Sequence, residues 1–312
     1  MPYIRYEYFT YGWSGGKQGE IIEETCAMQV HHLNAGTMCP VGRRVINGTG
    51  GLFQRARLIC HCLLIETGEG LVLVDTGIGL DDIAAPQRLG PRWVRQTSPR
   101  LDPAETALRQ IEAMGHSPDD VRHILLTHLD RDHAGGIADF PRAKVHVHQR
   151  EHAMAVSGTI AAPPGRYITG QWQHRPDWTF YGEEGEDWFG FKGVRALGER
   201  EPDILMIPLP GHTPGHCGIA VRAKDKWLLH AGDSYFYHGQ LQARPSMPIV
   251  LGLFQRKGDM DRATRVANQQ RLRALKASHG HEVTIVNSHD PVDYDRCRCG
   301  GHVAPSPSLV SR

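Results

Sequence analysis

Short apolar runs bounded by turn residues recur between residues 58 and 286. The first two, Leu58 to Glu66 and Leu71 to Asp75, are separated by Thr67-Gly68-Glu69-Gly70 and predict a β-hairpin. Similar runs predict strands at His123 to Thr127, Lys144 to His148, Ile204 to Pro208, Cys217 to Val221, Trp227 to His230 and Val283 to Val286.

Two segments have the apolar spacing of helices. One starts at Asp102, which we expect to cap the first turn, with Pro103 inside that turn and Glu105 completing a capping box. The other runs from Arg262 to Ser278 and is closed by Gly280. Strands interspersed with helices indicate the α/β class.

Residues 157–202 do not continue this rhythm. They contain Pro163-Pro164-Gly165 and many aromatic residues without a clear period, which predicts an inserted loop or cap rather than core. We expect one domain over residues 1–296 and a flexible tail over residues 297–312, where Pro and Ser alternate.

Charge and cysteine content narrow the function classes. A net charge of +1 provides no broad field for nucleic acid or an anionic membrane, and no apolar run is long enough to span a bilayer. The N-terminal segment lacks the apolar core of a signal peptide, and seven cysteines are an odd number, so we expect a cytoplasmic protein with reduced thiols. Cys297 and Cys299 are spaced more tightly than a zinc-knuckle pair, so their role stays open.

The candidate chemistry lies in Thr127-His128-Leu129-Asp130-Arg131-Asp132-His133, directly after a predicted buried strand. Imidazole and carboxylate groups at a strand end and in the following turn can converge on one metal ion. Three more strands end in polar motifs, which are Pro210-Gly211-His212-Thr213-Pro214-Gly215-His216, Ala231-Gly232-Asp233-Ser234 and Asn287-Ser288-His289-Asp290. Open α/β sheets gather their sites at such strand ends.

These motifs, together with Val74-Asp75-Thr76-Gly77, follow one another in an order that resembles the metallo-β-lactamase superfamily, from about Leu58 to Asp290. Within it the chain looks most similar to the acyl-homoserine-lactonase-like and general hydrolase branches. The resemblance implies a four-layer αββα sandwich, in which two mixed β-sheets pack face to face with helices outside.

The resemblance also implies a pair of divalent metal ions and a role for each matching residue. His128, Asp130 and His212 would hold the first metal, and Asp132, His133 and His289 the second. Asp233 would bridge the two. Asp75 would lie beneath the site and orient its ligands, and His216 would support the site without binding metal.

Asp130 departs from the family pattern, because the usual motif has a histidine at this position. The two metals would then face one more negative charge, and a hard oxygen donor shifts the preference from zinc toward manganese or iron. On this reasoning, Asp130→His alone is expected to keep the fold and shift the metal preference toward zinc.

The implied function is hydrolysis of an ester, lactone, thioester or amide in a small molecule, with metal-bound hydroxide as nucleophile and Asp132 or Asp233 as proton acceptor. The alternatives are an iron oxidoreductase, suggested by Asp130, and a non-catalytic metal-binding module. A homodimer is compatible with the sequence. Lactonase-like members use a tyrosine three residues past the bridging aspartate, and this chain has Phe236 there. Whether His31 or His32 reaches the site stays open.

Overall fold

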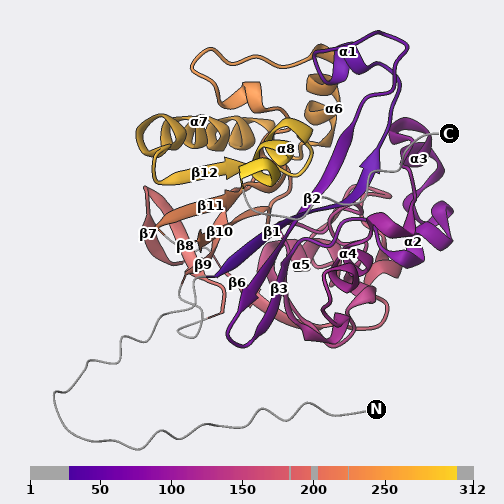
Figure 1. Ribbon diagram of the computed structural model, residues 1–312, viewed down its shortest axis with the longest axis vertical. Helices are drawn as coiled ribbons and strands as arrows, with labels where there is room; N and C mark the ends of the chain where they lie inside the picture. Colours follow the sequence, from indigo (N-terminus) through magenta and orange to yellow (C-terminus); the bar gives the residue numbers. More distant parts are fainter. Residues whose placement is uncertain (1–27, 183, 198–202, 224, 301–312) are drawn as a thin grey trace, which may run out of the picture.

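The computed structural model describes residues 28–182, 184–197, 203–223 and 225–300. Two six-stranded sheets form its centre, with the order β1-β2-β3-β4-β5-β6 in one and β12-β11-β10-β9-β8-β7 in the other. Figure 1 shows the first sheet and its helices on one side of the molecule and the second sheet with α7 on the other. The strands of the first sheet are β1 (Gln29–Met38), β2 (Leu58–Thr67), β3 (Gly70–Val74), β4 (Val121–Leu125), β5 (Lys144–His148) and β6 (Asp177–Tyr181).

The second sheet contains β7 (Glu186–Trp188), β8 (Phe191–Arg195), β9 (Ile204–Pro208), β10 (Cys217–Ala223), β11 (Lys226–His230) and β12 (Val283–Val286). Both sheets are mixed. Strands β3 to β6 run parallel, whereas β1 and β2 are antiparallel to their neighbours. In the second sheet, β9 and β11 are each antiparallel to β10, and β12 runs parallel to β11. The C-terminal ends of β9, β11 and β12 therefore lie at the same edge of the sheet.

The sheets are buried on both faces, which explains the continuous apolar runs in the sequence. On β2, Leu63 and Ile65 contact the second sheet, while Cys62 and Leu64 face the helices. Alternate residues of β9 divide in the same way between the sheet–sheet core and the layer under α7. The predicted αββα sandwich is confirmed.

Helices complete the outer layers. Ala107, Leu108 and Ile111 of α4 pack on the first sheet, and Leu272 and Leu275 of α7 pack on the second. The helices are α1 (Arg43–Ile46), α2 (Leu80–Ala84), α3 (Pro91–Thr97), α4 (Ala107–Ala113), α5 (Gln149–Ala155), α6 (Ile249–Gly258), α7 (Arg262–His279) and α8 (Pro291–Gly300). Within the described ranges, no helix has the length and apolar character that crossing a membrane requires.

The interpretation of residues 157–202 as a loop outside the core was wrong for much of the segment. Strand β6 lies at the edge of the first sheet and β7 at the edge of the second, with β8 between β7 and β9. Trp172, Trp188 and Phe191 are buried. Edge strands this short and aromatic lack the alternation that identifies a half-buried strand, so the pattern concealed them.

One helix start and the start of the predicted tail also need correction. Asp102 caps a short 3-10 helix, Pro103–Glu105, and Thr106 caps the following α4 by accepting a hydrogen bond from Arg109 N. The predicted flexible tail begins too early, because α8 continues through Gly300. The remainder of that tail, like residues 1–27, lies outside the described residues, and the domain boundaries stay a prediction.

A half-buried carboxyl beside α2 gives the fold a pH dependence. Burial, with the neighbouring Asp81 and Asp82 carboxylates, raises the pKa of Asp139 to about 7 from 3.8. The stability that its neutral form contributes is present at low pH and is lost as the pH rises through 7. Asp139→Asn cannot ionise. We therefore expect the difference in unfolding free energy between Asp139→Asn and wild type to shift by about 2 kcal/mol in favour of the variant when the pH is raised from 5 to 8. Urea unfolding at both pH values measures this difference, and a constant difference would contradict it.

Candidate metal centre

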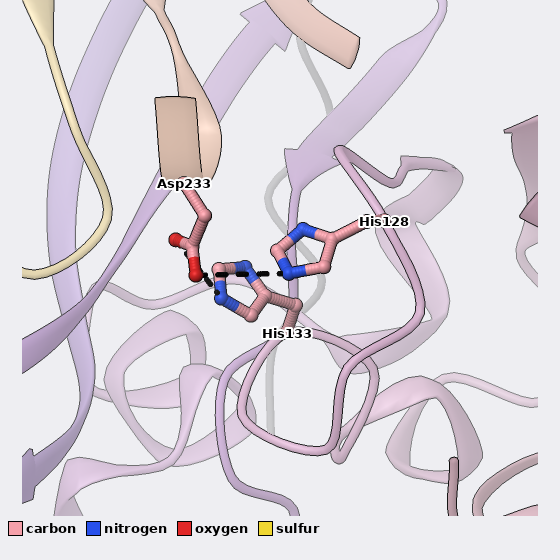
Figure 2. Close-up of side chains that lie close together, drawn as sticks. All are labelled: His128, His133 and Asp233. Carbon is pink, nitrogen blue, oxygen red and sulfur yellow. Dashed lines mark ion pairs between the residues drawn. The ribbon is translucent and has the colours of Figure 1, made fainter. Parts of the chain in front are cut away.

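Loops at the ends of four strands carry the predicted ligands. His128 follows β4, His212 follows β9, Asp233 follows β11 and His289 follows β12. Because these ends meet at one edge of the sandwich, all seven predicted ligands come together there. Figure 2 shows the side chains of His128, His133 and Asp233 converging.

The distances can be followed through the two predicted sets, which have Asp233 in common, while His128, His133 and Asp233 also form a group that spans both sets. In the first set, Asp233 Oδ2 lies 3.8 Å from His128 Nε2 and 3.3 Å from His212 Nε2. Asp130 Oδ2 completes this set, at 3.5 Å from His128 Nε2 and 3.1 Å from His212 Nε2.

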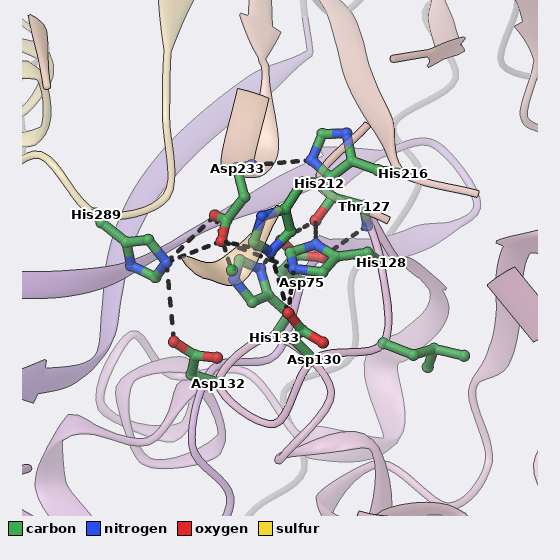
Figure 3. A network of polar contacts seen from close by, with 12 residues as sticks. Asp75, Thr127, His128, Asp130, Asp132, His133, His212, His216, Asp233 and His289 are labelled. Atoms are coloured by element: carbon green, nitrogen blue, oxygen red, sulfur yellow. Dashed lines mark hydrogen bonds and ion pairs between the residues drawn. The ribbon is translucent and has the colours of Figure 1, made fainter. Parts of the chain in front are cut away.

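In the second set, Asp233 Oδ1 lies 3.4 Å from His133 Nε2 and 3.2 Å from His289 Nε2. Asp132 Oδ2 joins it at 3.8 Å from His289 Nε2. Figure 3 shows Asp132 and His289 on one side of Asp233, with His128 and Asp130 on the other. Asp233 therefore lies between the two sets, and its Oδ2 also lies 3.3 Å from His289 Nε2.

The unpaired atoms of the cluster match the needs of a metal ion. His128 Nε2, His133 Nε2 and Asp233 Oδ1 are buried and have no hydrogen-bond partner among the described residues. Leaving such groups unpaired is costly unless something binds them. Ligands about 2.1 Å from a tetrahedral ion lie about 3.4 Å apart, which is close to the distances in both sets. The residues present therefore fit a pair of metal ions.

Asp75 lies beneath the cluster and contacts one set directly and the other through Thr127. Its Oδ1 accepts from Thr127 N at 2.8 Å, and its Oδ2 accepts from Thr127 Oγ1 and from His133 Nδ1, each at 2.8 Å. Thr127 Oγ1 in turn lies 3.0 Å from His128 Nδ1. Asp75 thus orients His133 directly and His128 through Thr127.

His216 supports Asp233 through the backbone. Its Nδ1 lies 2.9 Å from the carbonyl oxygen of Leu209, and its Nε2 accepts from Asp233 N at 2.9 Å. Gly232 has a φ of +52°, and a Cβ there would lie 2.5 Å from His216 Nε2. Only glycine therefore allows this close contact.

A residue that the sequence motifs did not reveal also enters the site. Arg166 Nε donates to Asp130 Oδ1 at 2.7 Å, and its Nη2 donates to Asp130 Oδ2 at 2.6 Å. Burial alone would raise the pKa of Asp130, but the Arg166 guanidinium, with His128 and His212, holds it well below its usual range. The extra carboxylate of this chain therefore has a cationic partner.

The protonation of the histidines links metal binding to pH. Burial lowers the pKa of His212, but Asp233 and Asp130 outweigh it and raise the pKa to about 9. A histidine must lose this proton before its Nε2 can bind a metal. Metal uptake is therefore expected to strengthen as the pH rises toward 9.

Comparison with known proteins assigns this arrangement to a family. The sequence profile described as the metallo-beta-lactamase superfamily matches residues 55–284. The chain belongs to this superfamily. A probable metallo-hydrolase of Mycobacterium tuberculosis is 40% identical over 271 residues, which cover 87% of this chain and 83% of the relative. The N-acyl homoserine lactonase AttM of Agrobacterium fabrum is 30% identical, covering 85% of this chain and 94% of the lactonase.

Solved structures show the same fold in hydrolases of the superfamily. An N-acyl homoserine lactone hydrolase with N-hexanoyl-L-homoserine at its metal centre superposes with a TM-score of 0.64 at 19% identity, covering 87% of this chain and 97% of its own. The dizinc quorum-quenching lactonase AidC has a TM-score of 0.54 at 17% identity, covering 85% and 88%. The prediction that this chain is a metallo-hydrolase of the superfamily is confirmed.

Histidines outside the motifs serve the scaffold. His31 pairs with Glu66 at 2.7 Å, and His32 Nδ1 lies 2.8 Å from His61 Nε2, so both contact the β1–β2 pair rather than the cluster. His146 contacts His123 and Tyr181 within the first sheet. Near the C-terminus, Cys297 is half-buried and packs against the sheet–sheet core, while Cys299 is exposed.

A pocket of about 190 Å³ opens onto the ligands. Asp130, Asp132, His212, Asp233 and His289 line its polar side, and Trp93, Phe236 and Phe254 line its apolar side. A second hollow of about 320 Å³, lined by Gly90, Pro91 and Gly165 among others, shares Trp93 and Lys257 with the first. The two hollows adjoin at these shared residues, and we refer to them together as the groove.

Proposed function

We propose that this protein hydrolyses the lactone or ester bond of a small acyl substrate at a pair of divalent metal ions. The observation that carries the proposal is the arrangement of two donor sets, shared through Asp233, at the end of a partly aromatic groove. Zinc is the metal we expect, as in the dizinc lactonase, and Asp130 also admits manganese or iron.

Each ligand has a role in this proposal. His128, Asp130 and His212 would hold one ion, Asp132, His133 and His289 the other, and Asp233 both. When bound, the ions supply an activated water as nucleophile and a Lewis acid for the carbonyl. Asp132 and Asp233 both line the pocket, so either carboxylate can take the proton that the nucleophile releases.

The groove favours a substrate with a polar reacting group and an apolar tail. The reacting carbonyl would lie over the ligands, and the acyl chain would run along Trp93 and Phe254. Phe236 occupies the tyrosine position of the lactonase-like members. Its neighbour Tyr235 is buried with its hydroxyl on the carbonyl oxygen of Ile285, and none of the described residues that line the pocket is a tyrosine.

The other readings receive less support. The curated relatives named above are hydrolases, so an iron oxidoreductase is not favoured. A non-catalytic module is opposed by the convergence of all seven ligands. The cytoplasmic location and the homodimer stay predictions.

The test combines metal analysis with a substrate panel. Protein produced with zinc, manganese or iron is assayed on acyl-homoserine lactones, aryl and alkyl esters, thioesters and β-lactams, with the added water detected by mass spectrometry. We expect about two metal ions per chain and turnover of lactones or esters that a chelator abolishes and metal restores. Fully loaded protein that opens none of these bonds would contradict the proposal.

The aromatic wall provides a prediction on specificity. Phe254 is 40% exposed and lines the pocket, so we expect Phe254→Ala to raise KM for a decanoyl substrate about tenfold, because a chain of that length loses apolar contact. KM for a butanoyl substrate should change little. Phe53, which is 92% exposed and absent from the pocket lining, provides the matched Phe53→Ala control. Equal effects on both chain lengths would show that Phe254 does not contact the acyl chain.

A further inference from the structure

The ion pair of Asp130 and Arg166 is the feature of the site that the family motif does not account for. Its two parallel hydrogen bonds engage both oxygens of the carboxylate, which is the strongest arrangement for this pair of side chains. Both side chains are largely buried, at 16% and 13% exposure. Asp130 Oδ2 nevertheless stays within 3.5 Å of the two histidines of the first set.

The chain holds Arg166 in this position from several sides. Arg166 Nη1 donates to the carbonyl oxygen of Gly258, the last residue of α6, at 2.8 Å. Arg131 Nη2, from the residue after Asp130, donates to the carbonyl oxygens of Gly165 and Arg166.

A second connection between the residues beside Asp130 and the segment that carries Arg166 runs through a buried carboxylate. Glu151 Oε1 accepts from Leu129 N and from Tyr167 Oη, each at 3.0 Å. The residues on either side of Asp130 are thus bonded to the segment that carries Arg166. These hydrogen bonds would not be needed if the Arg166 guanidinium only covered the pocket.

The sum of the ligand charges around the metals indicates what the Asp130–Arg166 ion pair does. The usual motif, with a histidine at position 130, leaves two carboxylates around the metals, so the ligand charge is −2. Here Asp130, Asp132 and Asp233 give −3, and Arg166 returns the sum to −3 + 1 = −2.

We propose that Arg166 is the built-in counter-charge that allows aspartate to replace histidine at position 130, so that Asp130 and Arg166 act as one unit of the first metal site. Arg166 acts through its charge beside Asp130 and is not itself a metal ligand in this account. The inference rests on the proposed metal centre and adds to it a residue outside the family motif.

The proposal changes the outcome expected for Asp130→His. Histidine alone leaves the buried guanidinium unpaired beside the metals and reduces the charge to −1, which opposes cation binding. We expect zinc retention to weaken at least about tenfold in Asp130→His and to return to within about threefold of wild type in Asp130→His/Arg166→Met. Arg166→Met alone should bind zinc at least as tightly as wild type, and Arg166→Lys about as tightly.

The experiment measures the chelator concentration that removes half of the zinc from each purified variant, with metal content determined by mass spectrometry. Thermal unfolding of the metal-free proteins accompanies it, and the second substitution should restore the Tm that Asp130→His lowers. Arg142→Met, which removes an exposed arginine paired with Asp119, is the matched control and should restore nothing.

The outcomes separate the two proposals. Wild-type protein that takes up none of zinc, manganese and iron would overturn the metal centre itself. A zinc-binding wild type with Asp130→His equally tight, or with no improvement on adding Arg166→Met, would overturn the role of Arg166. If neither Asp130→His variant folds, the comparison of Arg166→Met with Arg166→Lys tests the counter-charge role. Zinc retention that is weaker in Arg166→Met than in Arg166→Lys would contradict this role. A change in KM alone would assign Arg166 to the substrate and would also overturn the proposal.

Discussion

Asp233→Asn is expected to reduce hydrolysis of the substrate class by at least about a thousandfold, because the carboxylate belongs to both donor sets. Its two oxygens face the histidines of opposite sets at 3.2 to 3.8 Å. An amide offers one oxygen and one NH₂ group, so one set loses its anionic donor. The measurements are kcat/KM and metal content, and we expect the variant to retain at most one ion.

Asp139→Asn is the matched control, since it makes the same change at a carboxyl that contacts Leu80 rather than a ligand. This control should keep both ions and wild-type kcat/KM at neutral pH. An Asp233→Asn enzyme with two ions and a rate within tenfold of wild type would show that Asp233 does not bridge.

The ligands could be predicted because their positions relative to the strands are visible in the sequence. Each of His128, His212, Asp233 and His289 follows an apolar run, and the ends of those strands meet at one edge. The convergence was therefore implied once the strands were recognised. The family resemblance added which residues belong to which set, and that division stays a prediction.

Arg166 could not be found in this way. It lies 36 residues from Asp130, in the irregular stretch before β6, and no short motif marks it. Its position depends on its contacts with Gly258 and Arg131 and on the contact of Tyr167 with Glu151, which only the fold brings together. One clue was available in the sequence, namely that an additional buried carboxylate requires a cationic or metal partner.

The edge strands β6 to β8 were missed for a different reason. Strand prediction relies on period-two alternation, which needs one buried and one exposed face. β7 has only three residues, and it pairs with β8 alone, so its sequence carries little of that pattern. Residues 157–168 fit the predicted irregular segment better, and they include Arg166.

The second large effect is expected at Asp75, which contacts no metal in the proposed centre. In Asp75→Asn, an NH₂ group at the Oδ2 position would point at His133 Nδ1, which must then become the acceptor. His133 Nε2 would carry the proton and could not bind metal. The opposite orientation places NH₂ against the Thr127 N–H group, which is also a donor. We therefore expect metal retention and kcat/KM to fall about 10- to 100-fold.

Thr127→Val distinguishes the two hydrogen-bond connections by which Asp75 orients the ligands. It removes the hydroxyl between Asp75 and His128 but leaves the Asp75–His133 hydrogen bond in place. Because His128 belongs to the first set and His133 to the second, Thr127→Val should loosen mainly one ion, whereas Asp75→Asn should loosen both. Chelator titration of each variant counts the ions released. If Asp75→Asn retains both ions as tightly as wild type, orientation of His133 by Asp75 does not control the centre, and the histidine is held by its packing alone.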